Sequence, residues 1–135
     1  MNQSRDDSQP RAHILVVDDD EEFLGFMTML LADEGYVVEI AATLDEWEAK
    51  LRGSPPDVMV CDLWLTGAPR LALLDRLDTI PDTDSIPIIL CSGAPDDIDT
   101  ARTRLAGRPV AVLAKPFDID AVFTCLDRVL PERRP

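Results

Sequence analysis

Hydrophobic and polar positions divide the chain into alternating blocks. Short apolar runs rich in β-branched residues are followed by longer stretches in which apolar residues recur at helical spacing. The alternation predicts βα units around a parallel sheet. The five predicted strands cover residues 14–17, 37–41, 58–61, 86–91 and 110–114. Most of them are continuously apolar, which is expected when helices cover both faces of a sheet.

The helical stretches carry apolar stripes and start signals. The residues expected to form three of the stripes are Phe23, Met27 and Leu30; Leu71, Leu74 and Leu77; and Ile119, Val122, Phe123, Leu126, Val129 and Leu130. Thr43 and Glu46 form a capping box that begins the second helix. Pro69 is expected near the first position of the third helix, and residues 96–105 form a weaker fourth.

A chain of 135 residues suits one domain. We expect a (βα)5 unit, a flavodoxin-like doubly wound sandwich, over residues 11–130, with a five-stranded parallel sheet of order 2-1-3-4-5 and helices on both faces. A disordered arm is expected at residues 1–10 and a short tail at residues 131–135. The sequence shows no internal repeat and no linker between domains.

The net charge of the chain limits which classes of molecule it is expected to bind. The chain has 26 acidic and 13 basic residues and a net charge of −13, and residues 1–67 alone hold 15 of the acids. Nucleic acids and anionic membranes are therefore not expected as partners, because both would be repelled. The polar start is not a signal peptide, and no apolar stretch approaches the ~18 residues of a membrane helix. These features predict a soluble, cytoplasmic protein.

The cysteines and the histidine do not indicate a metal or disulfide site. Cys61, Cys91 and Cys125 lack CxxC spacing, and His13 is the only histidine. We interpret the three thiols as small buried hydrophobic groups in a reducing cytosol. His13 has no supporting acid or base nearby in the sequence, so a phosphohistidine role is not expected.

Polar residues follow four of the predicted strands. Asp18 and Asp19 come after the first strand, Asp62 ends the third, Ser92 follows the fourth and Lys115 follows the fifth. The C-terminal ends of parallel strands share one edge of the sheet, where open α/β sheets bind their ligands. With the order 2-1-3-4-5, the three aspartates are expected in one acidic pocket flanked by Ser92 and Lys115.

Three carboxylates this close together need a cation or raised pKa values. Oxygen ligands of this kind suit Mg2+. Lys115 is one of only two lysines, and its ammonium group could bind a phosphoryl oxygen. Asp62 would then act as a nucleophile that forms an acyl phosphate. Asp20 or the two glutamates after it are instead expected to cap the following helix at its positive end.

Four motifs together resemble the receiver domain of two-component response regulators, here of a single-domain type. They are Ile14-Leu-Val-Val-Asp-Asp-Asp, Asp57-Val-Met-Val-Cys-Asp62-Leu, Pro87-Ile-Ile-Leu-Cys-Ser92-Gly and Lys115-Pro-Phe. Their order and spacing match the family over nearly the whole chain.

The resemblance implies a role for each matching residue. Asp62 corresponds to the phosphoacceptor, Asp18 and Asp19 to the Mg2+ pair, and the backbone carbonyl of Trp64 to a further metal ligand. Ser92 corresponds to the switch hydroxyl and Lys115 to the charge partner of the phosphoryl group. The resemblance also implies a cis bond between Lys115 and Pro116, a histidine kinase or histidine phosphotransfer protein as phosphodonor, and a downstream protein partner. It further implies a monomer or a phosphorylation-dependent dimer, with no enzymatic activity beyond self-phosphorylation and autodephosphorylation.

Four positions depart from the family pattern. Thr66 stands where a proline is common, and Arg70 where a glycine usually opens the third helix, so the loop between them is expected to be reshaped. Val112 replaces the aromatic residue that turns inward on activation, and Gly93 replaces a common alanine, which loosens its loop. An aliphatic side chain cannot make the usual aromatic exchange, so phosphorylation would be read out elsewhere or not by the usual switch.

Three interpretations of function remain open at this stage. The first is a phosphoacceptor on Asp62 that switches protein contacts. The second is an interaction module of receiver fold with weakened or atypical phospho-switching, for which Val112 is the motivating residue. The third, an enzyme with an aspartyl-phosphate intermediate, is disfavoured because position 64 is Trp rather than a second Asp. The side chain of Trp64 is open to two readings, a hydrophobic lid or a barrier to the water that removes the phosphate.

Overall fold

The structure, a computed structural model, describes residues 11–92, 94–115 and 117–130. Strands and helices alternate along these residues, as the sequence predicted. The elements are β1 (His13–Val17), α1 (Glu21–Asp33), β2 (Val37–Ala41), α2 (Leu44–Gly53), β3 (Val58–Asp62), α3 (Ala72–Leu77), β4 (Ile88–Ser92), α4 (Pro95–Arg104), β5 (Val110–Ala114) and α5 (Ile119–Val129). The expected arm at residues 1–10, the tail at 131–135, Gly93 and the bond to Pro116 lie outside the described residues.

The five strands form one parallel sheet of order β2-β1-β3-β4-β5, which confirms the predicted topology. The winding direction reverses at β1, which lies between β2 and β3. The register pairs Val17 with Cys61 and Asp62 with Cys91. The polar residues at the C-terminal ends of β1, β3 and β4 are therefore brought to one edge of the sheet.

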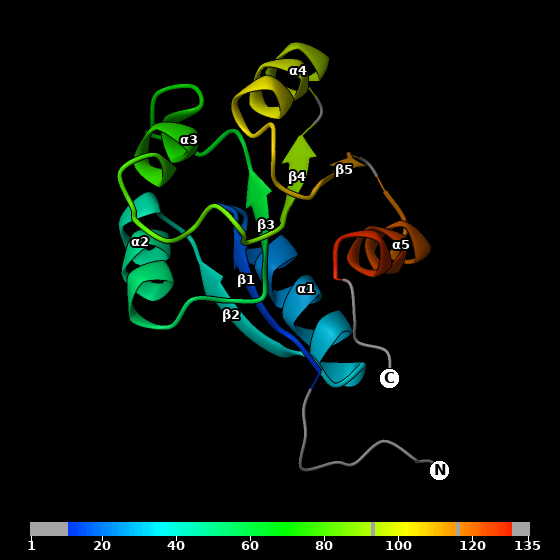
Figure 1. Ribbon diagram of the computed structural model, residues 1–135. Helices are drawn as coiled ribbons and strands as arrows, with labels where there is room; N and C mark the ends of the chain where they lie inside the picture. Colours follow the sequence, from blue (N-terminus) through cyan, green and yellow to red (C-terminus); the bar gives the residue numbers. More distant parts are fainter. Residues whose placement is uncertain (1–10, 93, 116, 131–135) are drawn as a thin grey trace.

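Helices cover both faces of the sheet (Figure 1). α1 and α5 lie on one face, and α2, α3 and α4 lie on the other. Side chains alternate between these layers, because successive residues of a strand point to opposite faces. Leu15 packs under α2 and α3 with Trp47 and Leu74, whereas Val16 packs under α1 and α5. Two apolar layers thus sandwich the sheet, which explains the continuously apolar strands.

Strand ends differ from the prediction by one or two residues. The fourth strand begins at Ile88 rather than at residue 86. The amide of Ile86 donates to the carbonyl of Thr83 in a turn (3.1 Å), and Pro87 has no N–H to donate. The ladder with β3 therefore starts after the proline. At the other end, β3 includes Asp62 and β4 includes Ser92, so both polar residues are the last residues of their strands.

The buried faces of two helices are turned slightly from those predicted. In α1 the buried residues are Leu24, Met27 and Leu31, while Phe23 and Leu30 are only half-buried. In α5 the first residue of the predicted stripe, Ile119, is 47% exposed. In both helices several neighbouring residues are apolar. The orientation of the helix on the sheet determines which of them are buried.

The third helix starts later than predicted. It begins at Ala72, and the residue before it, Leu71, has a left-handed backbone with φ of 61°. The prediction that Pro69 lies near the first helical position is wrong, because the carbonyl of Pro69 instead accepts from the amide of Ala72 (3.0 Å) in a turn. The buried residues of α3 are Leu73, Leu74 and Leu77, with Leu71 half-buried at their edge.

The predicted helix starts of α1 and α2 are confirmed. Asp20 caps α1 by accepting from the amides of Glu22 and Phe23. Thr43 caps α2 by accepting from the amide of Glu46 at 3.1 Å. The carboxylate of Glu46 reaches back to the amide of Ala42 at 2.8 Å, one residue before the cap.

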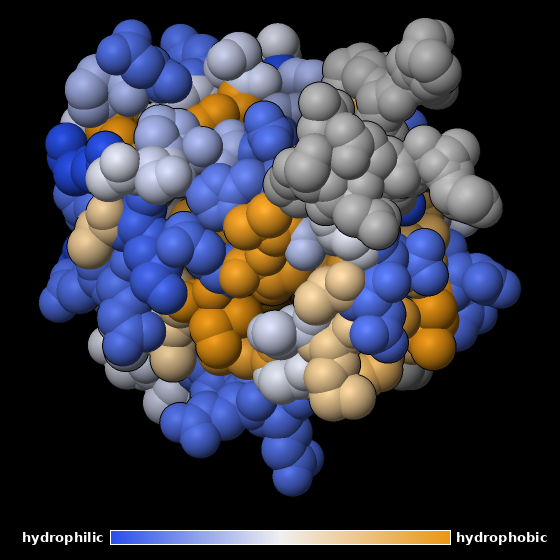
Figure 2. All heavy atoms as spheres, turned by 90° about the horizontal axis from the view of Figure 1, so that it is seen from below, coloured by the Kyte–Doolittle hydropathy of each residue, from blue (hydrophilic) through white to orange (hydrophobic). Residues whose placement is uncertain are grey.

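One face of the molecule is largely hydrophilic. In Figure 2, the face seen from below consists mostly of hydrophilic residues around a central hydrophobic area. Among the described residues, no helix combines the length and apolar character needed to cross a membrane.

Candidate functional site

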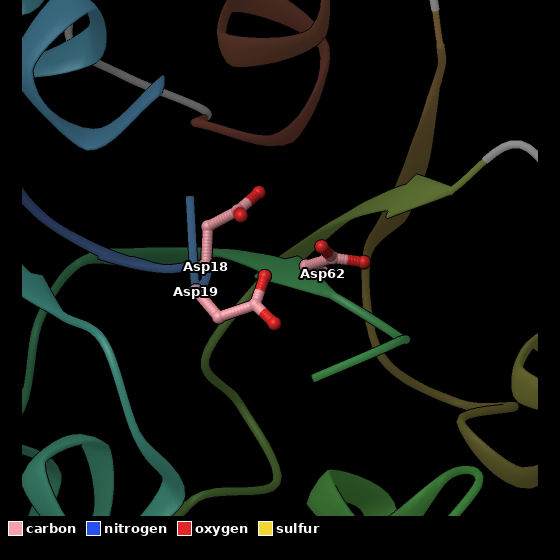
Figure 3. Close-up of side chains that lie close together, drawn as sticks. All are labelled: Asp18, Asp19 and Asp62. Carbon is pink, nitrogen blue, oxygen red and sulfur yellow. The ribbon is translucent and has the colours of Figure 1, made fainter. Parts of the chain in front are cut away.

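Three aspartates meet at the C-terminal edge of the sheet (Figure 3). Asp18 and Asp19 follow β1, and Asp62 ends the neighbouring strand β3. Each offers one carboxylate oxygen such that the three oxygens lie within 4.8 Å of one another. Asp18 is 1% exposed and Asp62 is 8% exposed. The expected acidic pocket is therefore present and partly withdrawn from water.

Hydrogen bonds hold each carboxylate in place. Asp18 accepts from the amide of Asp20 (2.9 Å), and Asp19 accepts from the amide of Thr66 (2.6 Å). Asp62 accepts from the amide of Trp64 (2.9 Å) through its Oδ1 atom. The loop after β3 therefore supplies two of the donors that orient the acids.

Lys115 supplies positive charge to this pocket. Its Nζ atom lies 3.1 Å from Oδ2 of Asp18 and 3.5 Å from Oδ2 of Asp62. The same atom lies 5.0 Å above the ring of Phe23, a cation–π contact that limits the directions open to the side chain. One ammonium group thus touches two of the three acids.

The surroundings change the proton affinity of several groups. Burial raises the pKa of Asp62, the charge of Asp18 adds to this, and the Trp64 amide and Lys115 act against it. The hydrogen bond from Thr66 lowers the pKa of Asp19. Burial by itself would lower the pKa of Lys115, but the charges of Asp18 and Asp62 more than offset it, so this pKa is raised. The pocket therefore favours a charged lysine beside acids of unequal strength.

The donor set of the pocket fits Mg2+. Three carboxylates, of which Asp18 and Asp62 are buried, face a single ammonium group, so negative charge remains in excess. A hard divalent cation prefers oxygen ligands of this type. Asp18, Asp19 and Asp62 are the side chains that would hold it.

Ser92 lies at the same edge but is engaged in its own turn. It is the last residue of β4 and is 4% exposed. Its hydroxyl oxygen accepts from the amide of Ala94 at 3.0 Å, and its carbonyl accepts from the amide of Lys115 at 3.4 Å. The structure therefore places Ser92 next to the end of β5, which leads to Lys115. Its hydroxyl oxygen is held by the Ala94 amide in a turn.

Trp64 contacts the pocket through its backbone and reaches away from it with its side chain. The side chain is among the large apolar groups of the surface, with the residue 63% exposed. The indole Nε1 donates to Oδ2 of Asp97 at 3.0 Å. Asp97 lies in the first turn of α4 and also accepts from Arg70.

Asp97 and Phe23 were not predicted to belong to this region. Asp97 follows Pro95 and Asp96, and acids at that place are common in the first turn of any helix. Its burial by Trp64 and Arg70 depends on the path of the loop between β3 and α3. Phe23 was expected only as a core residue of α1.

His13 and the cysteines take no part in the pocket. His13 begins β1 at the opposite edge of the sheet, where its Nε2 lies 3.2 Å from a carboxylate oxygen of Glu39. The three cysteines are free and buried, as predicted. Burial raises the pKa of Cys91 to about 12 and also raises the pKa of Cys61 and of Cys125. Thiols of this kind are unreactive at neutral pH.

The chain is similar to proteins of known identity. The nitrogen assimilation regulatory protein NtrX of Azorhizobium caulinodans is 31% identical over 90% of this chain and 26% of its own length. The phosphate regulon transcriptional regulatory protein PhoB of Rhizobium meliloti is 28% identical over 90% of this chain and 53% of its own length. The chain thus spans between about a quarter and a half of these two curated relatives.

Solved structures share the fold. The crystal structure of NtrX from Brucella abortus superposes with a TM-score of 0.77 at 29% identity, covering 89% of this chain and 27% of that one. The chemotaxis protein CheY4 of Vibrio cholerae gives a TM-score of 0.78 at 25% identity, covering 89% of this chain and 99% of that one.

A family model agrees with both likenesses. The model described as the response regulator receiver domain matches residues 14–127, which include every residue of the pocket. The chain belongs to the response regulator receiver domain family.

Proposed function

We propose that the chain accepts a phosphoryl group on Asp62 from a histidine kinase or a histidine phosphotransfer protein, and that this changes its affinity for a protein partner. Receiver domains are signalling modules rather than small-molecule enzymes, and phosphoacceptor signalling is their general role. The observation that carries the proposal is the position of Asp62, buried at the end of β3 between Asp18, Asp19 and Lys115.

The chemistry assigns a task to each residue. A carboxylate oxygen of Asp62 attacks the phosphorus of a phosphohistidine or small phosphodonor, the bond from phosphorus to the leaving group breaks, and an acyl phosphate forms. Lys115 offsets the charge of the transferred group from beside the attacking residue. Asp18 and Asp19, with Asp62 and the carbonyl of Trp64, would hold Mg2+. That ion would neutralise charge on the phosphoryl oxygens.

Ser92 can take part while it keeps its turn hydrogen bond. Its hydroxyl oxygen accepts from the Ala94 amide, and its O–H proton remains available to donate to a phosphoryl oxygen. Rotation of this O–H toward the phosphoryl group is the switch step that we propose for β4. The proposal also includes a cytoplasmic location and a monomer or phosphorylation-dependent dimer, and the buried free thiols support a reducing compartment.

Incubation with a small phosphodonor and Mg2+, followed by intact-mass measurement, tests the proposal. We expect one phosphate adduct on the natural chain and none on Asp62→Asn. Asp127→Asn is a matched control, because Asp127 is an exposed acid on α5 and its variant should be phosphorylated normally. Absence of an adduct on the natural chain, or an equal adduct on Asp62→Asn, would contradict the proposal.

A second function has an observation in its favour. Val112 is half-buried against the core layer of α2 to α4, where it cannot exchange between two positions as an aromatic switch does. An interaction module of receiver fold with weak phospho-switching is therefore the alternative. It would be favoured if a phosphate mimic bound at the acids while the amide spectrum changed nowhere beyond them.

A further inference from the structure

Asp97 is a buried acid on a mostly exposed helix. It is 3% exposed, whereas its neighbour Asp96 and the next acid, Asp99, are exposed. Asp97 is in the first turn of α4, where acids are favoured, but that position alone does not require burial. A carboxylate stays charged when buried only if other groups hold it.

Two side chains from the loop between β3 and α3 hold Asp97. Arg70 donates to Oδ1 from its Nε atom at 2.8 Å and from a terminal guanidinium nitrogen. Trp64 donates to Oδ2 from its indole nitrogen at 3.0 Å. The hydrogen bond from Arg70, with a smaller contribution from Trp64, lowers the pKa of Asp97. The acid is therefore charged and accepts at both oxygens.

Trp64 also contacts the phosphoacceptor. Its backbone amide donates to Oδ1 of Asp62 at 2.9 Å, while its indole contacts Asp97. One residue thus joins the end of β3 to the first turn of α4. The indole is otherwise open to solvent, since the residue is 63% exposed, so core packing does not explain its position.

We propose that Asp97 is a positioning residue: it holds the Trp64 side chain, and the contact between them transmits a change at Asp62 to the first turn of α4. Arg70 keeps Asp97 charged and in place. The contact would transmit phosphorylation to α4 in a chain that has Val112 at the position of the usual aromatic switch residue. This inference rests on the proposed phosphoacceptor role of Asp62.

The link has a reciprocal consequence. If binding at the acids moves α4 through Trp64, then loss of the Trp64–Asp97 contact must also change the affinity of the acids for their ligand. A hydrogen bond to a charged group is lost, and we expect the dissociation constant of a phosphate mimic to change by about 3- to 10-fold. Loss of a residue with a purely structural role would not change both the affinity for the mimic and the amide shifts of α4.

The experiment follows amide resonances while Mg2+ and beryllium fluoride, a phosphate mimic, are added. In the natural chain we expect shifts at Asp18, Asp19 and Asp62 and also at residues 96–98. Trp64→Phe keeps an aromatic ring but has no indole N–H, so shifts at the acids should remain while those at residues 96–98 fall to less than about half. Asp96→Asn removes one negative charge from the same turn and should respond like the natural chain.

A second variant tests the same link at an exposed residue, where a substitution is not expected to prevent folding. The Arg70 side chain is 57% exposed, so Arg70→Gln is expected to fold, and it should reduce the α4 response without abolishing it. Thermal unfolding of each variant checks that the fold is intact.

The outcomes separate this inference from the function on which it rests. A phosphate adduct on the natural chain with no response at residues 96–98, or with a full response in Trp64→Phe, overturns the inference and leaves the phosphoacceptor role standing. An unchanged affinity for the mimic in Trp64→Phe also overturns it. Absence of any adduct on the natural chain would contradict the phosphoacceptor role itself.

Discussion

At the scale of single residues, Lys115 makes both ion pairs and a cation–π contact in the pocket. Its ammonium group lies beside Asp18 and Asp62 and above the ring of Phe23. Two acids and an aromatic face together restrict a side chain that is flexible elsewhere. In the proposed reaction the lysine is placed in advance where charge would develop during phosphoryl transfer, so little reorganisation would be needed.

Replacement of this lysine should slow phosphorylation more than it affects folding. In Lys115→Gln we expect the rate of adduct formation from a small phosphodonor to fall by roughly 100-fold, because one charged donor to the phosphoryl group is lost. Time-resolved intact-mass measurement checks this. Lys115→Arg retains the charge with different geometry and should be intermediate.

Arg102→Gln provides the control for this substitution. Arg102 is exposed on α4, and its variant loses the same single positive charge. An equal loss of rate in both variants would show that net charge, rather than the position of Lys115, determines the rate.

At the scale of elements, α1 has a buried apolar face and, on its exposed face, a glycine that lowers its stability. Leu24, Met27 and Leu31 pack against the sheet, while Gly25 lies on the solvent side in the middle of the helix. Glycine lowers helix stability because its backbone loses more freedom on folding than that of other residues. A Cβ atom added at Gly25 would meet nothing within 4 Å.

Gly25→Ala should therefore stabilise the protein. We expect the free energy of unfolding to rise by about 0.5 to 1 kcal/mol, measured by chemical denaturation. Gly107→Ala is the contrasting variant, since Gly107 also has open space around it but has φ of 100°. Alanine there should destabilise by about 1 kcal/mol, because its Cβ clashes with the backbone at positive φ. The same sign for both changes would contradict this reasoning.

At the scale of the whole molecule, arginines tie together the helices of one face. Arg76 of α3 lies 2.8 Å from Asp45 and 3.0 Å from Glu48, both in α2. Arg104 of α4 pairs in the same way with Asp75 of α3 and with Asp78, which directly follows α3. Exposed pairs of this kind contribute little to stability. The chain as a whole carries a net charge of −13, and many of its acidic residues are exposed.

This charge predicts that the chain does not bind DNA by itself. Double-stranded DNA should show no change in electrophoretic mobility with about 10 µM protein at low salt, because a protein needs clustered positive charge to displace counterions. The result should be the same with and without phosphodonor. Retardation that disappears on addition of salt would contradict the prediction, since that dependence is the signature of phosphate contacts.

Much of the fold was predictable because it follows from local patterns. The apolar runs and helical stripes identified all ten elements, and the capping residues Asp20 and Thr43 marked two of the helix starts. The predicted strand order places Asp18, Asp19 and Asp62 at one edge of the sheet, and the structure has them there. Boundaries were less well predicted, because the start of β4 and the start of α3 depend on the hydrogen bonds of Ile86 and Ala72.

The family, the topology and the acids of the pocket can therefore be inferred from the order of residues, since each depends on the type of a residue and its place relative to a strand end. The path of the loop after β3 depends instead on contacts between distant parts of the chain. Leu71 takes up a left-handed backbone there, and Trp64 and Arg70 bury Asp97. Helical spacing places Asp97 on the same face of α4 as the buried Ala101, four residues later, and so separates it from the exposed Asp96. The order of residues does not show what holds its carboxylate, because Trp64 and Arg70 meet it only when the loop between β3 and α3 folds against α4.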